Sequence, residues 1–175
     1  DKLEEYYLVG YAVSAYMANK KDESLDISKF GIQKYAKDIT FDRVALWSAV
    51  DLQKNDEAIN FAKVIINTDS VEKSARDYIY YGLALKGNKQ YDEAIAQYQK
   101  AFDLTKDDYK PYQYMADTYA EMGQEDKALE CNEIYMAHNQ NATPSDYAKL
   151  ANIYVQKAEK AGPTKQANLD KAYGI

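Results

Sequence analysis

Residues 75–108 read ARDYIYYGLALKGNKQYDEAIAQYQKAFDLTKDD, and residues 109–142 read YKPYQYMADTYAEMGQEDKALECNEIYMAHNQNA. A fixed period of 34 residues is typical of stacked repeats, in which each unit buries its apolar face against its neighbours. The sequence therefore predicts an array with a long surface groove as its natural binding place. At this spacing Tyr78 matches Tyr112, Tyr80 matches Tyr114, Gly82 matches Ala116, Ala94 matches Ala128, and Ile95 matches Leu129.

The composition is that of a folded, helical protein. The chain has 175 residues, of which 46% are apolar and 29% are charged, and it contains only seven glycines and three prolines. Its net charge of −6 argues against nucleic-acid binding, because that binding relies on a concentrated basic surface. No apolar run approaches the roughly 20 residues that a membrane span needs, so membrane insertion is not expected.

Apolar residues recur at helical spacing throughout, and no alternating pattern favours strands. Asp69 with Glu72 predicts a capping box ahead of one helix, and Thr143 followed by Pro144 predicts the start of another. The expected helices lie near residues 3–19, 26–38, 41–53, 56–67, 71–87, 91–104, 109–122, 125–138, 144–160 and 165–174. They are assigned to one domain, 1–175, with approximate units 1–40, 41–74, 75–108, 109–142 and 143–175.

The first of the two aligned stretches resembles the tetratricopeptide repeat (TPR). That family has a large residue at position 4, Gly or Ala at 8, Ala at 20, an aromatic at 24 and Ala at 27. The resemblance implies an all-α, right-handed α-solenoid of about five antiparallel helix pairs, a TPR-like superhelix. The family's slots hold Tyr78, Gly82, Ala94, Tyr98 and Ala101 in the first stretch, and Tyr112, Ala116, Ala128, Asn132 and Tyr135 in the second.

The resemblance is fainter over residues 1–74. Gly10 and Ala49 are the best candidates there for the small residue at position 8, which lets the two helices of a pair approach closely. The loop before Asp56 is expected to be shorter than the loop of the family.

The sequence offers no candidate for a catalytic centre, a cofactor site or a metal site. Gly82 to Gly87 approaches the spacing of a phosphate loop but lacks its Gly-Lys-Ser/Thr ending. Cys131 and His138 are seven residues apart on one helix, roughly 10 Å along its axis, too far for a nucleophile and its base. Cys131 is therefore expected to be a buried apolar residue, and His138 to bond carbonyls at a helix end.

The resemblance implies that the first helix of each pair lines the concave groove, with positions 2, 5 and 6 exposed there. Positions 2 and 6 share a helix face, so successive repeats are expected to present a cation beside an aromatic ring. Position 5 adds an apolar wall of Tyr7, Leu46 and Ile79. The predicted peptide-binding groove consists of Arg43, Trp47, Arg76, Tyr80, Lys110 and Tyr114.

This ladder favours a non-catalytic scaffold that binds an extended peptide or protein segment, including one with acidic groups. Ordinary packing of the tyrosines between helices is the alternative for the ladder itself. Two other functions stay open: a structural module that self-associates or fills its groove internally, and glycan binding on the aromatic rings. The family's clamp for acidic chaperone tails is not expected, because its slots hold Ile79, Leu83, Tyr114, Ser145 and Lys149.

The compartment is open. The chain starts at Asp1 without a methionine, which suits an exported, periplasmic bacterial protein trimmed of its signal. A cloning boundary explains the same start equally well, and a cytoplasmic location stays open.

Overall fold

The computed structural model describes residues 2–140, 142–160, 170–171 and 174, and the described residues contain helices and turns but no strand. None of the helices in this part of the chain is long and apolar enough to cross a membrane. The helices are α1 (Lys2–Met17), α2 (Lys21–Lys34), α3 (Ile39–Asp51), α4 (Asn55–Asn67), α5 (Ala75–Gly87), α6 (Tyr91–Thr105), α7 (Lys110–Glu121), α8 (Glu125–His138) and α9 (Pro144–Lys160).

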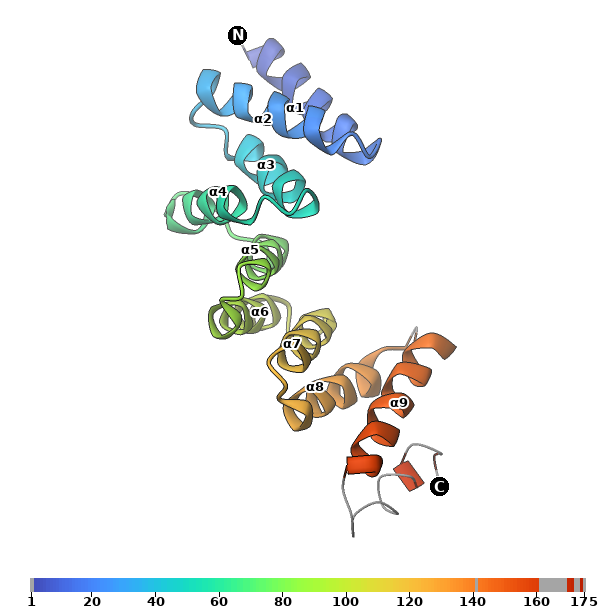
Figure 1. The fold of residues 1–175 in the computed structure, drawn as a ribbon. Helices are drawn as coiled ribbons and strands as arrows, with labels where there is room; N and C mark the ends of the chain where they lie inside the picture. The colour runs from blue at the N-terminus through green and yellow to red at the C-terminus, as the bar shows by residue number, and fades with distance from the viewer. Residues whose placement is uncertain (1, 141, 161–169, 172–173, 175) are drawn as a thin grey trace. The chain divides into compact units, whose positions relative to one another are not determined.

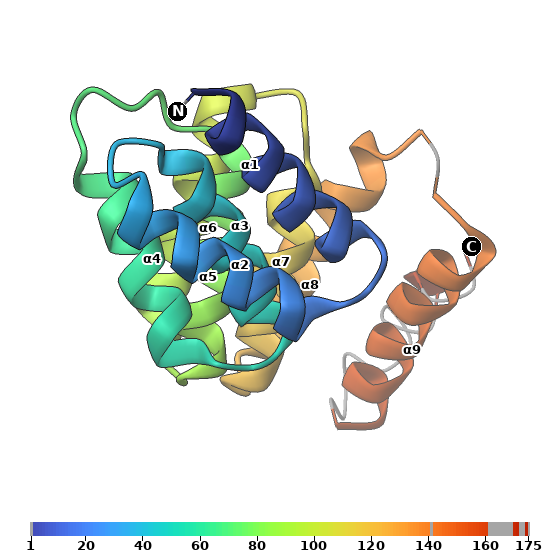
Figure 2. The same ribbon diagram turned by 90° about the horizontal axis from the view of Figure 1, so that it is seen from above.

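The chain forms two compact units, an N-terminal unit of residues 1–105 and a C-terminal unit of residues 106–175. In the N-terminal unit each helix packs against the next, and α3 also contacts α1 and α5. Figure 1 shows α1 to α6 following one another in chain order, and Figure 2 looks down on this stack with α1 and α2 nearest the viewer. In the C-terminal unit α7 packs against α8, and α8 packs against α9.

Most predicted helices agree with the structure to within about three residues at each end. The starts of α8 and α9 are as predicted. Thr143 caps α9, since the Asp146 N–H donates to Thr143 Oγ1 at 3.3 Å, and Asp146 Oδ2 also accepts from the Thr143 N–H at 2.9 Å. The predicted last helix, 165–174, falls almost wholly outside the described residues. The division into one domain with five units stays a prediction.

One turn recurs between the two helices of each pair. Its central residues are Asn19, Gln53, Lys89 and Gly123, which have positive φ angles of 61°, 58°, 60° and 72° and follow one another at 34, 36 and 34 residues. In every case the next N–H donates to the carbonyl five residues back, as from Lys20 to Ala15 at 2.9 Å. This bond satisfies a carbonyl that the helix end leaves free. The repeat therefore extends through residues 1–74.

The recurring turn corrects two expectations about the first 74 residues. Helix α2 begins at Lys21, not near residue 26, because the turn at Asn19 ends one residue before it. The turn before α4 has the same form and length as the others, so the expected short loop is wrong. The repeat that is two residues longer gains its length in the loop between α4 and α5. This loop, residues 68–74, has seven residues, whereas the loops before α3 and α7 have four.

The turn also fixes which residues stand in the close-packing positions. A Cβ on Gly82 would lie 2.4 Å from the ring of Tyr98, so α5 and α6 approach each other there as predicted. In α1 the corresponding residue is Ala12, which is fully buried, and not Gly10, where a Cβ would meet nothing within 4 Å. In α3 and α4 the sizes are reversed, since Leu46 and Ala62 occupy these positions and both are fully buried.

Candidate functional site

Three aromatic rings from successive first helices lie in a row on the N-terminal unit. The ring centroids of Tyr16 on α1 and Trp47 on α3 are 5.8 Å apart, and those of Trp47 and Tyr80 on α5 are 6.2 Å apart. The hydroxyls of Tyr16 and Tyr80 are 3.1 Å apart, so a hydrogen bond also joins the two outer residues directly. We call Tyr16, Trp47 and Tyr80 the aromatic seam. All three side chains are half-buried, so they pack together and still present ring surface to a ligand.

Tyr16 is held in place by an ion pair from the neighbouring helices. Lys21 Nζ lies 3.3 Å from the centroid of the Tyr16 ring, donates to the Tyr16 carbonyl at 3.0 Å and pairs with Asp51 Oδ2 at 3.0 Å. Burial, together with the hydrogen bond to Tyr80, raises the pKa of the Tyr16 hydroxyl. The hydroxyl therefore stays neutral around pH 7 and holds α1 against α5.

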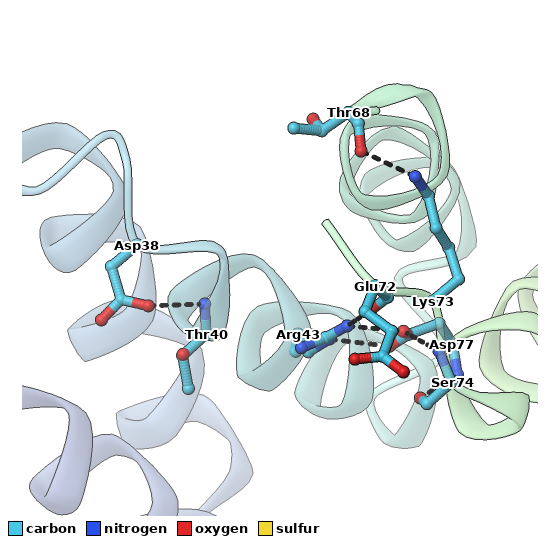
Figure 3. A network of polar contacts seen from close by, with 8 residues as sticks. All are labelled: Asp38, Thr40, Arg43, Thr68, Glu72, Lys73, Ser74 and Asp77. Carbon is cyan, nitrogen blue, oxygen red and sulfur yellow. Dashed lines mark hydrogen bonds and ion pairs between the residues drawn. The ribbon is translucent and has the colours of Figure 1, made fainter. Parts of the chain in front are cut away.

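Arg43 connects α3 to the start of α5 (Figure 3). Its Nε donates to Asp77 Oδ1 at 3.0 Å, and its Nη2 donates to Asp77 Oδ2 at 2.9 Å and to the carbonyl of Glu72 at 2.6 Å. Asp77 is 1% exposed, so this is a nearly buried, two-pronged ion pair. The Arg43 charge is thereby matched within the chain. Arg43 is therefore not available as the groove cation that the sequence predicted.

The same carboxylate caps α5. Asp77 Oδ2 accepts from the N–H of Ser74 at 2.8 Å, while the N–H of Asp77 donates to Ser74 Oγ at 3.3 Å, which makes a capping box. The box expected at Asp69 and Glu72 is wrong, and α5 starts at Ala75 and not at residue 71. The box at Ser74 is favoured because its carboxylate gains the Arg43 ion pair as well.

An open hollow of about 810 Å³ lies beside the seam, a volume in the range of pockets that hold small ligands. Its walls are Arg43 and Trp47 of α3, Arg76 of α5 and the 68–74 loop. Lys73 Nζ donates to the Thr68 carbonyl at 2.7 Å across that loop (Figure 3). The Arg76 guanidinium carbon lies 5.1 Å from the centroid of the Trp47 ring, a cation–π contact at the edge of the hollow.

The structure thus brings four predicted groove residues, Arg43, Trp47, Arg76 and Tyr80, into one neighbourhood of the N-terminal unit. The predicted apolar wall is only partly correct, because Leu46 is fully buried in the core while Tyr7 is 66% exposed on α1. Lys110 and Tyr114 lie on α7 of the C-terminal unit, where Lys110 is exposed and Tyr114 is half-buried. Their continuation of the ladder stays a prediction.

Four residues of the site were missed in the sequence: Tyr16, Lys21, Asp51 and Asp77. Tyr16 was missed because residues 1–74 carry the family pattern weakly. The repeat spacing does not find it either, because the Asn19 turn lies 34 residues before the Gln53 turn, and at that spacing Val13, and not Tyr16, matches Trp47. Asp77 does give a signal, since an acidic residue three positions after Ser74 matches a capping box.

The residues that could suggest chemistry have structural roles. Cys131 is buried, and that burial raises the pKa of its thiol to about 11, so it is a protonated, apolar residue at neutral pH. His138 Nδ1 lies 2.9 Å from the carbonyl of Ile134 at the end of α8, and its ring stacks on Tyr109 at a centroid distance of 3.9 Å. Within the described ranges no group of three or more His, Cys, Asp or Glu side chains is placed to hold a metal ion.

Comparisons with known proteins agree with the fold. Residues 85–153 match a family model described as "Tetratricopeptide repeat". A crystal structure of MamA aligns over 93% of this chain and 92% of its own with a TM-score of 0.74 and 18% identity. MamA from Desulfovibrio magneticus RS-1 aligns over 79% and 78%, with a TM-score of 0.72 and 16% identity.

A third similar structure is YrrB, described as a TPR protein with an unusual peptide-binding site. It aligns over 94% of this chain and 84% of its own, with a TM-score of 0.69 and 14% identity. No curated protein sequence matches the chain. Identities this low establish the fold and not the function. The predicted fold class, an all-α arrangement of TPR-like helix pairs, is confirmed.

Proposed function

Because residues 85–153 match the tetratricopeptide-repeat family and the chain shares the fold of solved TPR proteins, we propose that it is a non-catalytic scaffold that binds an extended segment of a partner protein. The segment lies along the first helices of the N-terminal unit, across the aromatic seam of Tyr16, Trp47 and Tyr80. YrrB, which shares the fold, is described as having a peptide-binding site.

One observation carries this proposal: the seam rings come from three successive first helices and remain half-buried. An extended chain advances about 3.3 Å per residue, so helices roughly 10 Å apart meet about every third residue. Rigid rings supply apolar contact at low cost in conformational entropy. On this proposal Lys110 and Tyr114 serve the same segment, or another part of the partner, on α7.

The proposal is tested by selecting displayed random peptides against the full chain and titrating the selected peptides. Trp47 is the only tryptophan, so its fluorescence reports binding directly. Tyr80→Ala should weaken binding by about tenfold, because it removes a contact ring, while its melting temperature falls by only a few degrees. Tyr114→Ala tests the extension onto α7 in the same assay.

The matched control is Tyr6→Ala on α1, whose ring is 73% exposed and lies outside the seam, and its affinity should equal that of the wild type. The proposal fails when no selected peptide changes the Trp47 signal, or when Tyr80→Ala unfolds the chain without a separate loss of affinity. Titration with neutral polysaccharides separates glycan binding, which would give a saturable Trp47 signal without any peptide.

Self-association is a second candidate, favoured by the outer face of α1. Leu3, Tyr7 and Tyr11 are between 56% and 66% exposed there. In the register of the recurring turn, Tyr7 and Tyr11 correspond to Phe41 and Ala45, which are fully buried where α3 packs in the unit. Light scattering over a hundredfold range of concentration should then show oligomers that the double variant Tyr7→Lys, Tyr11→Lys abolishes. A constant monomer mass would exclude this function.

A further inference from the structure

The two arginines of the chain, Arg43 and Arg76, and its single tryptophan, Trp47, line the same hollow. Arginine and tryptophan are the residue types most enriched where interfaces concentrate their binding energy. Their gathering at one place, in a chain that otherwise uses lysine for positive charge, marks this hollow off from the rest of the N-terminal unit.

The hollow also has the opposite sign of charge to the whole chain. The chain carries a net charge of −6, yet the wall of the hollow contains the cations Arg43, Lys73 and Arg76 against one carboxylate, Glu72. A local reversal of sign attracts and orients an anionic partner.

The three cations differ in the groups that they already bind. Arg43 is matched by Asp77 in the two-pronged ion pair, and the Lys73 ammonium donates to the Thr68 carbonyl. Arg76 is exposed, and among the described residues no carboxylate lies within ion-pair distance of it. Lys73 keeps its charge but is half-buried and held by that carbonyl, so Arg76 is the exposed cation of this wall and the one that can bind an external anion.

The position of Arg76 suits a carboxylate, which can accept two hydrogen bonds from the guanidinium at once. Its guanidinium lies over the Trp47 ring at 5.1 Å, which restricts the side chain and leaves its N–H groups open to a two-pronged bond. Ile39, Trp47 and Val71 form apolar wall beside it. The site thus places one cationic fork beside apolar surface.

The wall of the hollow that the loop forms is held in place by contacts within the fold. The seven-residue loop 68–74 forms one wall, and it is tied by Lys73 to Thr68, by Arg43 to the Glu72 carbonyl and by the Ser74–Asp77 box. These contacts fix the wall before a ligand arrives, which lowers the entropy cost of binding.

We infer that this hollow binds an acidic side chain of the partner segment, with the carboxylate on Arg76 and a neighbouring aromatic or aliphatic side chain on Trp47, Ile39 and Val71. The inference rests on the proposed scaffold function and specifies its partner as a peptide in which Asp or Glu stands beside an apolar residue. Arg43 acts as a positioning residue, since it holds the loop and does not touch the carboxylate.

The test uses the full chain and blocked twelve-residue peptides in a Gly-Ser background. Each peptide carries one Asp or Glu beside one Phe or Leu, and its partner peptide carries Asn or Gln in place of the acid. Trp47 fluorescence measures the affinities. Because a hydrogen bond to a charged group stabilises by about 1.5–3 kcal/mol, the acidic peptide should bind at least about tenfold more tightly than its amide partner.

Arg76→Gln should remove this preference, so that acidic and amide peptides bind the variant equally. Lys63→Gln is the matched control: Lys63 is exposed on α4 and does not line the hollow, and its removal changes the net charge by the same amount. The preference should survive that change. Circular dichroism checks that both variants melt as the wild type does.

The outcomes separate the two proposals. Binding of acidic and amide peptides with equal affinity by the wild type, or an undiminished preference in Arg76→Gln, overturns the assignment of the hollow while peptide binding itself stands. If the Trp47 fluorescence responds neither to these peptides nor to those selected against the full chain, both the scaffold function and the assignment of the hollow are overturned.

Discussion

Gly82 of α5 touches the ring of Tyr98 of α6, and this contact sets the closest approach of that helix pair. A Cβ at position 82 would lie 2.4 Å from Tyr98 Cε1, and Tyr98 is fully buried, so its ring has little room to move. Gly82→Ala should therefore lower the free energy of unfolding by about 1–3 kcal/mol, despite the better helix propensity of alanine. Urea denaturation measures the change.

Gly10→Ala is the matched control for this substitution. A Cβ at position 10 would meet nothing within 4 Å, and the residue is exposed in the middle of α1. Alanine should raise the free energy of unfolding by about 0.5–1 kcal/mol there, because glycine costs helix stability. Equal effects of the two substitutions would contradict the assignment of Gly82 as the close-packing residue.

Asp42 is a buried carboxyl in the first turn of α3. Burial raises its pKa, and the nearby Asp38 carboxylate raises it further, although a bond to its own backbone N–H opposes both. Since the folded-state pKa lies above the unfolded one, stability falls as pH rises through the window between them. The loss is complete once the pH lies above the folded-state pKa.

Asp42→Asn should therefore raise the melting temperature at pH 7, by a few degrees at most, since about 1 kcal/mol corresponds to about 2–4 °C at this size. The gain should disappear below about pH 3.8, where the carboxyl is protonated in both states. Asp92→Asn, an exposed first-turn carboxylate of α6, is the control and should give no gain. A lower melting temperature for Asp42→Asn at pH 7 would contradict this account.

At the scale of helices, the junction between α3 and α5 depends on Asp77, which caps α5 and pairs with Arg43. Asp77→Ala leaves the Arg43 guanidinium without its partner in a largely buried place, so the free energy of unfolding should fall by about 3–5 kcal/mol. Ser74→Ala removes only the capping hydroxyl and should cost about 1 kcal/mol. Chemical denaturation of both variants measures the difference.

A comparable loss in the two variants would show that the ion pair adds nothing beyond the cap. The double variant Arg43→Ala, Asp77→Ala gives a further check. Its stability should recover part of the loss of Asp77→Ala, because no uncompensated charge remains.

The helices were predictable from the sequence because their apolar period and several of their caps are local signals. The turns were harder to predict. Of the four residues at the centre of the recurring turn, three are Asn19, Gln53 and Lys89, and only Gly123 is the glycine that such a turn favours. The reversal of sizes at Leu46 and Ala62 hid the family pattern in α3 and α4. What the fold keeps is the summed side-chain volume of the two facing positions, one on each helix, and not the size of the residue at either position alone.

The candidate site was predicted in part for a similar reason. The slots of the resemblance supplied Trp47, Arg76 and Tyr80, which lie together at the seam and the hollow, although the register of the recurring turn matches Tyr80 with Val44 and not with Trp47. They could not show that Arg43 pairs with Asp77, because that contact joins residues 34 apart through the longer loop 68–74. Long-range pairing of this kind depends on how one repeat sits on the next.

At the scale of the whole molecule, stability should vary along the chain as in an array where each helix contacts only its neighbours. Helix α3 contacts α1, α2, α4 and α5, whereas the described part of the chain gives α9 extensive contact with α8 alone. Trp47 on α3 reports the N-terminal unit, while circular dichroism at 222 nm reports every helix. The Trp47 midpoint in urea should therefore lie above the midpoint of circular dichroism.

Two substitutions sharpen this prediction, because each destabilises a different end of the array. Ala158→Gly, at a fully buried position of α9, should lower the free energy of unfolding of this end of the array by about 1 kcal/mol. The early part of the dichroism transition should then move to lower urea concentration, while the Trp47 midpoint stays unchanged. Gly82→Ala in α5 should lower the Trp47 midpoint. Coincident transitions for the wild type, or a shift of the Trp47 midpoint by Ala158→Gly, would mean that one cooperative unit spans both reporters, since only strong coupling between repeats carries a local loss that far.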